Sequence, residues 1–212
     1  MPDCRFKLYL VTDRSRTRRR PLLEVREQAL AGGVDAVQLR EKDLPAGELF
    51  ALASRLRGLC RQYGAPFLIN DRIDVALAVG ADGVQLPVTS FAPADARLLL
   101  GPGALIGAST HSLSEARAAA AGGADFLVFG PIFDTPSKRP FGTPLGLQAL
   151  AEVAREVQLP VLAIGGITIE RGASVRRHGA HGVALIGAIL EAADPRTAAV
   201  AVRAALELAE SG

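Results

Sequence analysis

A short motif recurs four times in this chain and decides its fold. The first two copies are Gly33-Val34-Asp35-Ala36-Val37-Gln38-Leu39 and Gly80-Ala81-Asp82-Gly83-Val84-Gln85-Leu86. The other two are Gly123-Ala124-Asp125-Phe126-Leu127-Val128-Phe129 and Gly179-Ala180-His181-Gly182-Val183-Ala184-Leu185. In each copy the glycine ends a helix, and the apolar run that follows is a strand buried on both faces. Successive copies lie about 43 to 56 residues apart, which is the length of two β-α units.

Further apolar runs and helical patterns alternate between these copies. The additional strands are expected at residues 7–11, 67–69, 104–106 and 160–164. Helical periodicity is found at residues 22–31, 46–63, 93–100, 112–121, 145–157 and 196–209. Eight strands that alternate with eight helices predict an α/β protein, a (β/α)8 TIM barrel, with residues 1–212 as one domain. An open doubly wound sheet is the alternative, but it would not need a near-regular repeat.

Composition narrows the classes of function. The chain has 212 residues, of which 49% are hydrophobic, and a formal net charge of +2. This near balance gives no reason to expect nucleic acid or a membrane as a partner. The two cysteines show no metal-binding spacing, and no apolar run approaches the roughly 20 residues of a membrane-spanning helix. Because the amino terminus also lacks the apolar core of a signal peptide, we expect a cytoplasmic protein.

One short segment is rich in arginine. It contains Arg14, Arg16, Arg18, Arg19 and Arg20. A solvated loop is the simpler interpretation, and a dedicated anion-binding site is the alternative.

The residues just after each strand are the candidates for chemistry, because barrels of this kind bind ligands at the carboxyl ends of their strands. Gln38, Arg40 and Lys42 alternate at the end of the second strand and therefore lie on one face. If that face points inward, an amide and two cations line the mouth of the barrel. Asn70 and Asp71 follow the third strand, where Asp71 either holds a divalent metal or caps the next helix.

Two glycine loops predict a phosphate site. Gly165-Gly166 follows the seventh strand and Ile186-Gly187 follows the eighth, where backbone N–H groups can approach an oxyanion. Glycines that serve only tight turns are the structural alternative. The sixth loop, residues 130–142, is the longest stretch without periodicity, and we interpret it as a lid over a phosphorylated ligand. Its polar side chains include Thr135, Ser137, Lys138 and Arg139.

A single histidine, His111, follows the fifth strand. Ser112 and Glu115 have the spacing of a capping box, so His111 is expected in an exposed strand-to-helix turn. The other two histidines, His178 and His181, flank a helix-to-strand turn and are expected on the opposite face. Histidine, with an ordinary pKa of about 6.5, can both accept and return a proton near neutral pH.

Seven short motifs that include these candidates occur in order along nearly the whole chain. They are Leu8-Tyr9-Leu10-Val11-Thr12-Asp13, Val37-Gln38-Leu39-Arg40-Glu41-Lys42-Asp43, Ile69-Asn70-Asp71-Arg72, Ser109-Thr110-His111-Ser112, Phe129-Gly130-Pro131-Ile132-Phe133, Thr135-Pro136-Ser137-Lys138 and Ala163-Ile164-Gly165-Gly166-Ile167. In these motifs the chain resembles the thiamine phosphate synthase and TenI superfamily, and their number and order make the match specific. The resemblance implies a TIM barrel, as the repeat does.

The synthase branch of that family joins a pyrimidine pyrophosphate to a thiazole phosphate, and magnesium helps the pyrophosphate to leave. By resemblance, the contacts to the pyrimidine pyrophosphate would be Gln38, Arg40, Lys42, Asn70, Ser109 and Lys138. The contacts to the thiazole phosphate would be Thr135, Ser137, Gly166, Ile186 and Gly187. Asp71 would hold Mg²⁺.

One residue departs from the synthase pattern. After the fourth strand the synthases carry an aspartate that is the second magnesium ligand, and Ser90 stands at that position here. A neutral hydroxyl neither balances the charge of the metal nor competes well with water. The run from Val84 to Phe91 resembles instead the TenI branch, which includes thiazole tautomerases that shift a proton without a metal. The catalytic histidine of the family falls on His111.

We therefore expect an isomerase of thiamine biosynthesis, a thiazole tautomerase in which His111 shuttles the proton and no cofactor is needed. A thiamine phosphate synthase, which is a transferase with Mg²⁺ at Asp71, is the alternative, because the run Gln38-Leu39-Arg40-Glu41-Lys42 is retained. A non-catalytic regulator that binds thiazole or thiamine phosphates is a lesser one. The expected ligands are small phosphorylated molecules. A homodimer is implied only by the resemblance, because barrels of this family often form dimers.

Overall fold

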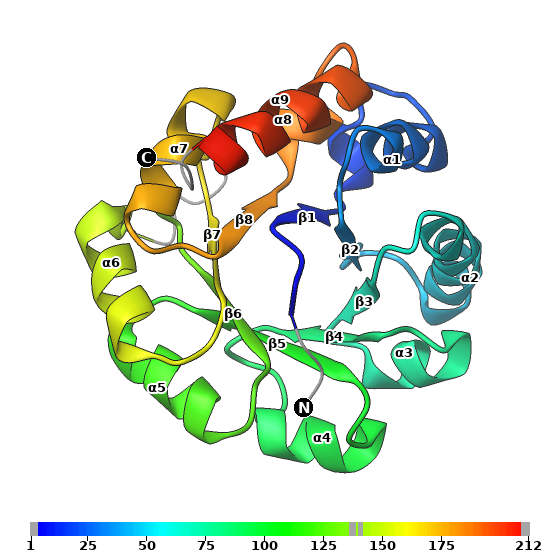
Figure 1. Cartoon of the computed structure of the whole chain (residues 1–212). Coiled ribbons are helices and arrows are strands. Elements are labelled where there is room, and N and C mark those ends of the chain that lie inside the picture. The colour runs from blue at the N-terminus through cyan, green and yellow to red at the C-terminus, as the bar shows by residue number, and fades with distance from the viewer. Residues whose placement is uncertain (1–3, 136–138, 140–141, 209–212) are drawn as a thin grey trace.

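The structure is a computed structural model that describes residues 4–135, 139 and 142–208. Within these residues, eight parallel strands close into a barrel in sequence order, with the helices outside (Figure 1). The strands are β1 (Leu8–Val11), β2 (Ala36–Leu39), β3 (Phe67–Asn70), β4 (Gly83–Leu86), β5 (Leu105–Thr110), β6 (Phe126–Phe129), β7 (Val161–Ile164) and β8 (Gly182–Leu185). The (β/α)8 barrel predicted from the repeated motif is confirmed.

The helices follow the strands one by one. They are η1 (Arg14–Arg16), α1 (Leu22–Ala31), α2 (Ala46–Gln62), α3 (Ile73–Val79), α4 (Pro93–Leu100), α5 (Leu113–Ala121), α6 (Gly146–Glu156), α7 (Ile169–Arg177), α8 (Gly187–Leu190) and α9 (Pro195–Leu208). The sequence pattern assigned no ranges to η1, α3, α7 and α8. Three of these are short, with three, seven and four residues in η1, α3 and α8, and α7 contains Gly172, a weak helix former. In the described part of the chain, no helix has both the length and the apolar character that a membrane crossing requires.

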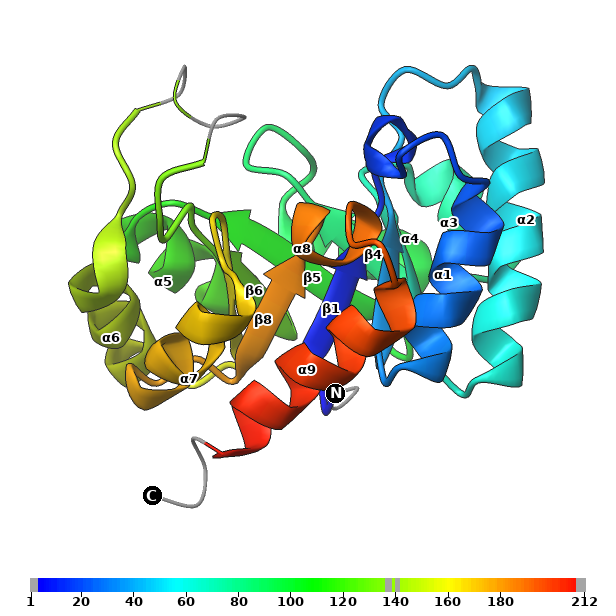
Figure 2. The same cartoon turned by 90° about the horizontal axis from the view of Figure 1, so that it is seen from above.

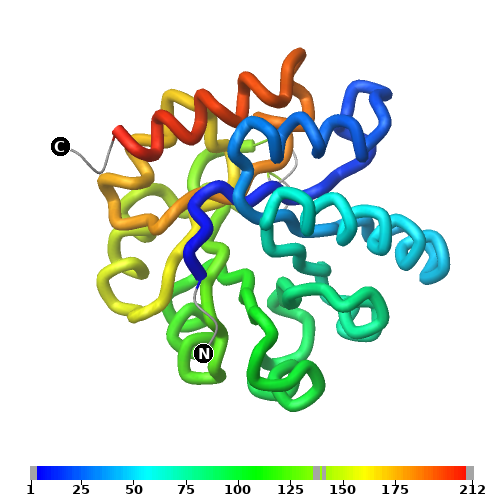
Figure 3. The backbone as a smooth tube through the Cα atoms, turned by 45° about the vertical axis from the view of Figure 1, so that its right-hand side comes forward, coloured from blue at the N-terminus to red at the C-terminus, as the bar shows by residue number. Residues whose placement is uncertain are grey.

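Side chains of each strand alternate between the inside of the barrel and the surrounding helices. Tyr9 and Phe126 point inward and pack with Phe6, at ring-centroid distances of 5.1 to 5.9 Å. Outward residues such as Leu10 and Ile69 join the larger core under the helices. The segment before β1 runs across the amino end of the barrel (Figure 1, Figure 3). The amino-terminal half of the interior is therefore filled by apolar side chains.

The aspartate of the repeated motif ties two neighbouring strands together. In the third copy, the buried Asp125 accepts a hydrogen bond from the backbone N–H of Ile106 in β5 at 2.7 Å. It also pairs with Arg97 of α4 at 2.7 Å. Equivalent contacts join Asp35 to the N–H groups of Lys7 and Leu8 and to Arg203, and Asp82 to the N–H of Phe67 and to Arg57. Three of the four copies of the motif thus share a carboxylate contact that fixes the register of β1–β2, β3–β4 and β5–β6, and the fourth copy has His181 at this position.

All of these contacts lie at the amino ends of the strands, opposite the expected site. In Figure 2 the arrows of β1 and β8 point upward, toward α8. The loops that follow the parallel strands share this upper side, so the residues predicted to bind ligands lie together at one end of the barrel.

Replacing Asp125 by alanine is expected to lower the free energy of unfolding by about 3 kcal/mol. The change leaves the buried N–H of Ile106 without its acceptor and the Arg97 guanidinium without its counter-ion. Asp95→Ala, at an exposed position in α4, is the control and is expected to change the same quantity by about 0.5 kcal/mol. Urea unfolding followed by circular dichroism measures both, and a wild-type value for Asp125→Ala would show that the carboxylate does not hold the strands.

Candidate active site

Four inward-facing polar side chains lie toward the carboxyl ends of β2 to β5. Gln38 is buried and donates to the Tyr9 hydroxyl at 3.1 Å, and burial raises the pKa of Tyr9, so this hydroxyl stays neutral. Asn70 of β3 pairs in register with Gln85 of β4, which donates to the Ser109 hydroxyl at 3.1 Å. The side-chain oxygen of Gln85, Oε1, is buried without a hydrogen-bond partner among the described residues. This polar floor suits a ligand with several hydrogen-bonding atoms.

Gln85 was not among the residues predicted to bind a ligand. It occupies the same place in the repeated motif as Gln38, since Val37-Gln38-Leu39 and Val84-Gln85-Leu86 have the same spacing from their glycines. Because equivalent positions of a repeat face the same way in the barrel, this correspondence was a usable signal.

The loops after β1 and β2 are joined beyond the ends of the strands. The buried Thr12 hydroxyl accepts a hydrogen bond from the Arg40 N–H at 2.7 Å. The Glu41 carboxylate turns back and accepts from the Arg14 N–H at 3.2 Å. Arg40 is half-buried and Lys42 is exposed, and neither forms an ion pair with a described residue. Both cations are thus available to an anionic ligand at the rim.

A third cation, Arg26 of α1, lies entirely inside the protein beneath this rim. Its guanidinium donates to the backbone carbonyl of Gln38 at 3.4 Å. The other two guanidinium nitrogens have no partner among the described residues. Burial lowers the pKa of Arg26 to about 10, while the nearby Glu41 carboxylate favours its charged form. Arg26 therefore remains a cation at neutral pH and helps to stabilise the buried Glu41.

The Asp71 carboxylate meets the loop after β4. The Ser90 hydroxyl donates to Asp71 Oδ1 at 2.5 Å. Asp71 has a φ of +67°, in the left-handed region that aspartate enters more readily than most residues. Helix α3 begins after Arg72 without a side-chain cap, so the alternative role of Asp71 as a helix cap is not observed.

No cluster of three or more His, Cys, Asp or Glu side chains is arranged around a metal position in the described residues. A divalent cation at this edge would therefore depend on Asp71, on the neighbouring Ser90 hydroxyl and on oxygen atoms of a ligand.

His111 lies exposed at the end of β5, as the sequence indicated. Half of the predicted capping box forms, because Ser112 Oγ accepts from the Glu115 N–H at 3.2 Å, whereas the Glu115 carboxylate accepts from the N–H of His111, one residue before the cap, at 2.6 Å. The His111 ring contacts the Gly130 carbonyl through Nδ1. Since a carbonyl only accepts, Nδ1 carries a proton in this contact. His111 thus links the end of β5 to the end of β6.

The glycines after β7 are required by close packing. Gly165 and Gly166 have φ values of +97° and +63°. A Cβ on Gly165 would come within 2.6 Å of Pro131, and one on Gly166 within 2.8 Å of the Phe133 side chain. The loop after β7 therefore lies directly against the loop after β6. The tight-turn explanation holds for both glycines, and contact with a phosphate stays a prediction.

The loops after β6 and β8 contain the remaining candidates. Thr135 and Ile186 are only partly buried, whereas the predicted ligands Ser137 and Lys138 lie outside the described residues. Arg139 pairs with Asp134 at 2.6 Å, so its charge is already matched in this structure.

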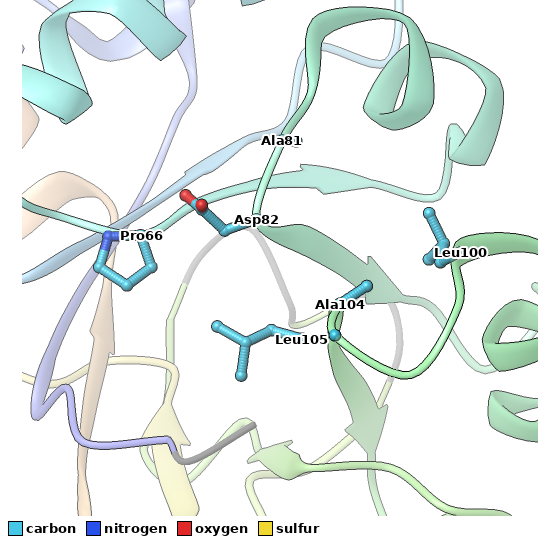
Figure 4. Close-up of a pocket in the computed structure, with 7 residues that line it drawn as sticks. Pro66, Ala81, Asp82, Leu100, Ala104 and Leu105 are labelled. Carbon is cyan, nitrogen blue, oxygen red and sulfur yellow. The ribbon is translucent and has the colours of Figure 1, made fainter. Parts of the chain in front are cut away.

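A pocket at the amino ends of β3, β4 and β5 is unrelated to these candidates (Figure 4). Pro66, Asp82 and Leu105 are among its lining residues. The Asp82 carboxylate is already bound to Arg57 and to a backbone N–H, so it offers no free charge to a ligand. His178 and His181 precede β8 and lie at this end too, as expected.

Polar and cationic side chains thus gather at the carboxyl end of the strands, the place where enzymes with a (β/α)8 barrel bind their substrates. A sequence profile described as thiamine monophosphate synthase matches residues 8–189. The chain belongs to this family, which also includes the TenI proteins, and the resemblance inferred from the seven motifs is confirmed.

Individual relatives cover nearly the whole chain. A putative thiamine-phosphate synthase of Geobacter sulfurreducens is 52% identical over 95% of this chain and 94% of its own length. A thiamine-phosphate synthase of Roseiflexus castenholzii is 46% identical over 93% of this chain and 86% of its own. The solved structure of thiamine phosphate pyrophosphorylase from Pyrococcus furiosus is 40% identical, with a TM-score of 0.88 and 97% of both chains covered.

These similarities show that the predicted activity was wrong. The sequence favoured a thiazole tautomerase, an isomerase, because Ser90 stands where synthases have an aspartate. The two sequence relatives are named as synthases instead, and the solved structure is named as a thiamine phosphate pyrophosphorylase. Ser90 nevertheless keeps a polar contact with this edge of the site, since its hydroxyl donates to Asp71 Oδ1 at 2.5 Å. The role of His111 as a proton shuttle in isomerisation falls with that prediction.

Proposed function

We propose that the protein is a thiamine-phosphate synthase, a transferase that joins hydroxymethylpyrimidine pyrophosphate to thiazole phosphate. The bond between the methylene carbon and the pyrophosphate oxygen breaks, and this oxygen keeps the electron pair. The thiazole nitrogen then shares its lone pair with the carbon, which forms a C–N bond without any proton transfer at the reacting atoms. The observation that carries the proposal is the pairing of Asp71 with Ser90 beside a rim that contains Arg40 and Lys42.

Two cations at the rim support binding of the pyrimidine pyrophosphate. Arg40 and Lys42 have no competing ion pair with a described residue, and a pyrophosphate is a strong acceptor of charge-assisted hydrogen bonds. The amides below the rim suit the nitrogen atoms of a pyrimidine ring. On this proposal the substrate contacts Gln38, Arg40, Lys42, Asn70, Ser109 and Lys138.

The thiazole phosphate is assigned to the other half of the mouth, after β6, β7 and β8. Barrels of this fold commonly bind phosphate at the loops after their last two strands. The proposed contacts are Thr135, Ser137, Gly166, Ile186 and Gly187. The two substrates would then meet across the mouth, with the thiazole nitrogen facing the methylene carbon.

The residues at the Asp71 edge fit a magnesium ion that arrives with the pyrophosphate. Mg²⁺ is usually held by one or two carboxylates together with substrate phosphates and water. Asp71 supplies one carboxylate, and Ser90 supplies a neutral oxygen next to it. When bound, Mg²⁺ would neutralise the charge that develops on the departing pyrophosphate.

His111 receives a different role from the one predicted. The synthase reaction has no proton to move, and the imidazole already holds the Gly130 carbonyl through Nδ1. We therefore assign His111 to the placement of the loop after β6, which carries two of the proposed contacts to the thiazole phosphate, Thr135 and Ser137.

Purified protein supplied with both substrates and Mg²⁺ is expected to form thiamine phosphate and to release pyrophosphate in equal amounts. Chromatography of the product and an enzymatic pyrophosphate assay measure the two. Removal of the metal with a chelator should lower the rate by at least about 100-fold, because the leaving group loses its charge stabilisation.

The matched variants for this assay are Asp71→Asn and Asp74→Asn. Asp71→Asn is expected to lower kcat by about 100-fold, whereas the exposed Asp74 in the first turn of α3 should be replaceable with little effect. Failure of the wild-type protein to release pyrophosphate would contradict the proposed function. Binding of thiazole phosphate by such an inactive protein would favour the non-catalytic alternative.

Two replacements of His111 distinguish a tether from a proton carrier. His111→Asn is expected to keep kcat/KM within about threefold of the wild type, since the asparagine amide can donate to the Gly130 carbonyl from near the position of Nδ1. His111→Ala has no donor, so kcat/KM should fall by about tenfold. If both variants lost activity equally, by about 100-fold or more, the imidazole itself would be needed for the chemistry.

A further inference from the structure

The arginine-rich segment after β1 makes contacts that neither sequence interpretation foresaw. It is neither a freely solvated loop nor a cluster of unpaired cations. Three of its five arginines, Arg14, Arg16 and Arg20, are bound to the loops after β2 and β8. These two loops carry the cations proposed for the pyrophosphate and the glycine proposed for the thiazole phosphate.

Arg14 holds the loop after β2. Its guanidinium forms two hydrogen bonds with the Asp43 carboxylate, at 2.6 and 2.7 Å, and a third with Glu41 at 3.2 Å. The Glu41 side chain is only 3% exposed and also accepts from the Arg14 backbone N–H. The bonds from Arg14 hold the pKa of Asp43 below its usual value, so the pair stays ionised at neutral pH. Arg40 and Lys42 alternate with these two acidic residues and are fixed along with them.

Arg16 contacts both ends of α8, the short helix after β8. Its Nε donates to the Glu191 carboxylate at 2.5 Å. A Cβ on Gly187 would come within 2.6 Å of the Arg16 guanidinium. Glycine at this position therefore leaves the space that the guanidinium occupies, and Arg16 packs directly against a proposed phosphate contact.

Arg20 holds the end of α8. Its guanidinium donates to the carbonyls of Leu190, Ala192 and Ala193 at 2.8 to 3.1 Å. These are carbonyls at and beyond the carboxyl end of a helix, where a cation is favoured. Arg20 therefore holds the carboxyl end of the short helix, next to Glu191, the partner of Arg16.

The loop that carries these arginines is itself internally fixed. Thr17 is 2% exposed, and its hydroxyl contacts the carbonyls of Arg14 and Arg20 at 3.2 and 2.7 Å. Arg18 and Arg19 project into solvent with φ values of +54° and +63°. Such a backbone is unfavourable for residues with a Cβ, so it persists only where the surrounding contacts impose it.

We propose that Arg14, Arg16 and Arg20 are positioning residues that brace the loops after β2 and β8 against the loop after β1. The catalytic effect of this brace rests on the proposed function. The brace sets the distance between the rim that would bind the pyrophosphate and the loop that would bind the thiazole phosphate. Each guanidinium is already engaged by carboxylates or carbonyls, so these three arginines act through the loops. A shift of about 1 Å between reacting groups can reduce a rate by about 100-fold, which gives a rigid brace its value.

The test compares the two ends of the brace by steady-state kinetics. Arg14→Gln is expected to raise KM for the pyrimidine pyrophosphate about tenfold and to leave KM for the thiazole phosphate within about twofold. Arg16→Gln is expected to raise KM for the thiazole phosphate about tenfold and to leave KM for the pyrimidine pyrophosphate within about twofold. Arg18→Gln is the matched control, because it removes the same charge from the same loop without removing a contact with a described residue. Its two KM values should stay within about twofold of the wild type.

A partner variant separates positioning from direct contact with substrate. Glu191→Gln weakens the hold on Arg16 but leaves the guanidinium in place and without its counter-ion. If Arg16 acts through the loop, Glu191→Gln should raise KM for the thiazole phosphate at least about threefold. If Arg16 bound the phosphate itself, this variant would leave that KM unchanged or lower it, which would overturn the proposal.

Amide hydrogen exchange gives a readout that does not depend on turnover. Arg14→Gln should speed exchange in residues 40–45, and Arg16→Gln in residues 186–191, each by about tenfold and in its own loop only. Exchange unchanged in both loops would overturn the brace, as would equal rises of both KM values in Arg14→Gln, Arg16→Gln and Arg18→Gln. A wild-type protein that forms no product would refute the proposed function and the catalytic consequence of the brace, and exchange would still decide whether the arginines hold their loops.

Discussion

The carboxylate of the repeated motif is the contact on which the rest of the structure depends. Asp125 lies just before one strand and accepts the N–H of its neighbour, and Asp35 and Asp82 repeat the arrangement. A slip of one residue in a strand pair would turn every side chain to the other face. The contact at the amino end therefore decides that Gln38 and Gln85 point into the barrel mouth. Because each carboxylate is matched by an arginine, the three aspartates fix this register without leaving a free charge.

Charge is arranged differently at the two ends of the barrel. At the amino end each motif aspartate has an arginine partner and a backbone donor. At the carboxyl end Arg40 and Lys42 have no ion pair with a described residue, and Asp71 has a serine hydroxyl as its neighbour. Unmatched groups of this kind do not stabilise the fold, and in the proposed function their partners are the charges of the substrates. In the arginine brace, the ion pairs of Arg14 with Glu41 and Asp43 hold the loop that carries the unmatched cations Arg40 and Lys42.

The fold could be predicted from the sequence because its signals are local and repeated. The motif around Asp125 marked four strands, and the spacing of Ser112 and Glu115 marked the start of α5. The activity could not be derived from the same kind of signal. Ser90 was taken as the loss of a metal ligand, whereas its effect depends on a neighbour 19 residues away in sequence, Asp71. The brace was hidden for the same reason, since Arg16 and Glu191 are 175 residues apart.

The most direct test of the account is a crystal structure of the protein with Mg²⁺, inorganic pyrophosphate and thiazole phosphate. We expect pyrophosphate against Arg40 and Lys42, and Mg²⁺ in contact with the Asp71 carboxylate. We also expect the thiazole phosphate at the loops after β7 and β8, with Arg16 still paired to Glu191. Pyrophosphate bound away from Arg40 and Lys42, or a metal that does not touch Asp71, would contradict the account.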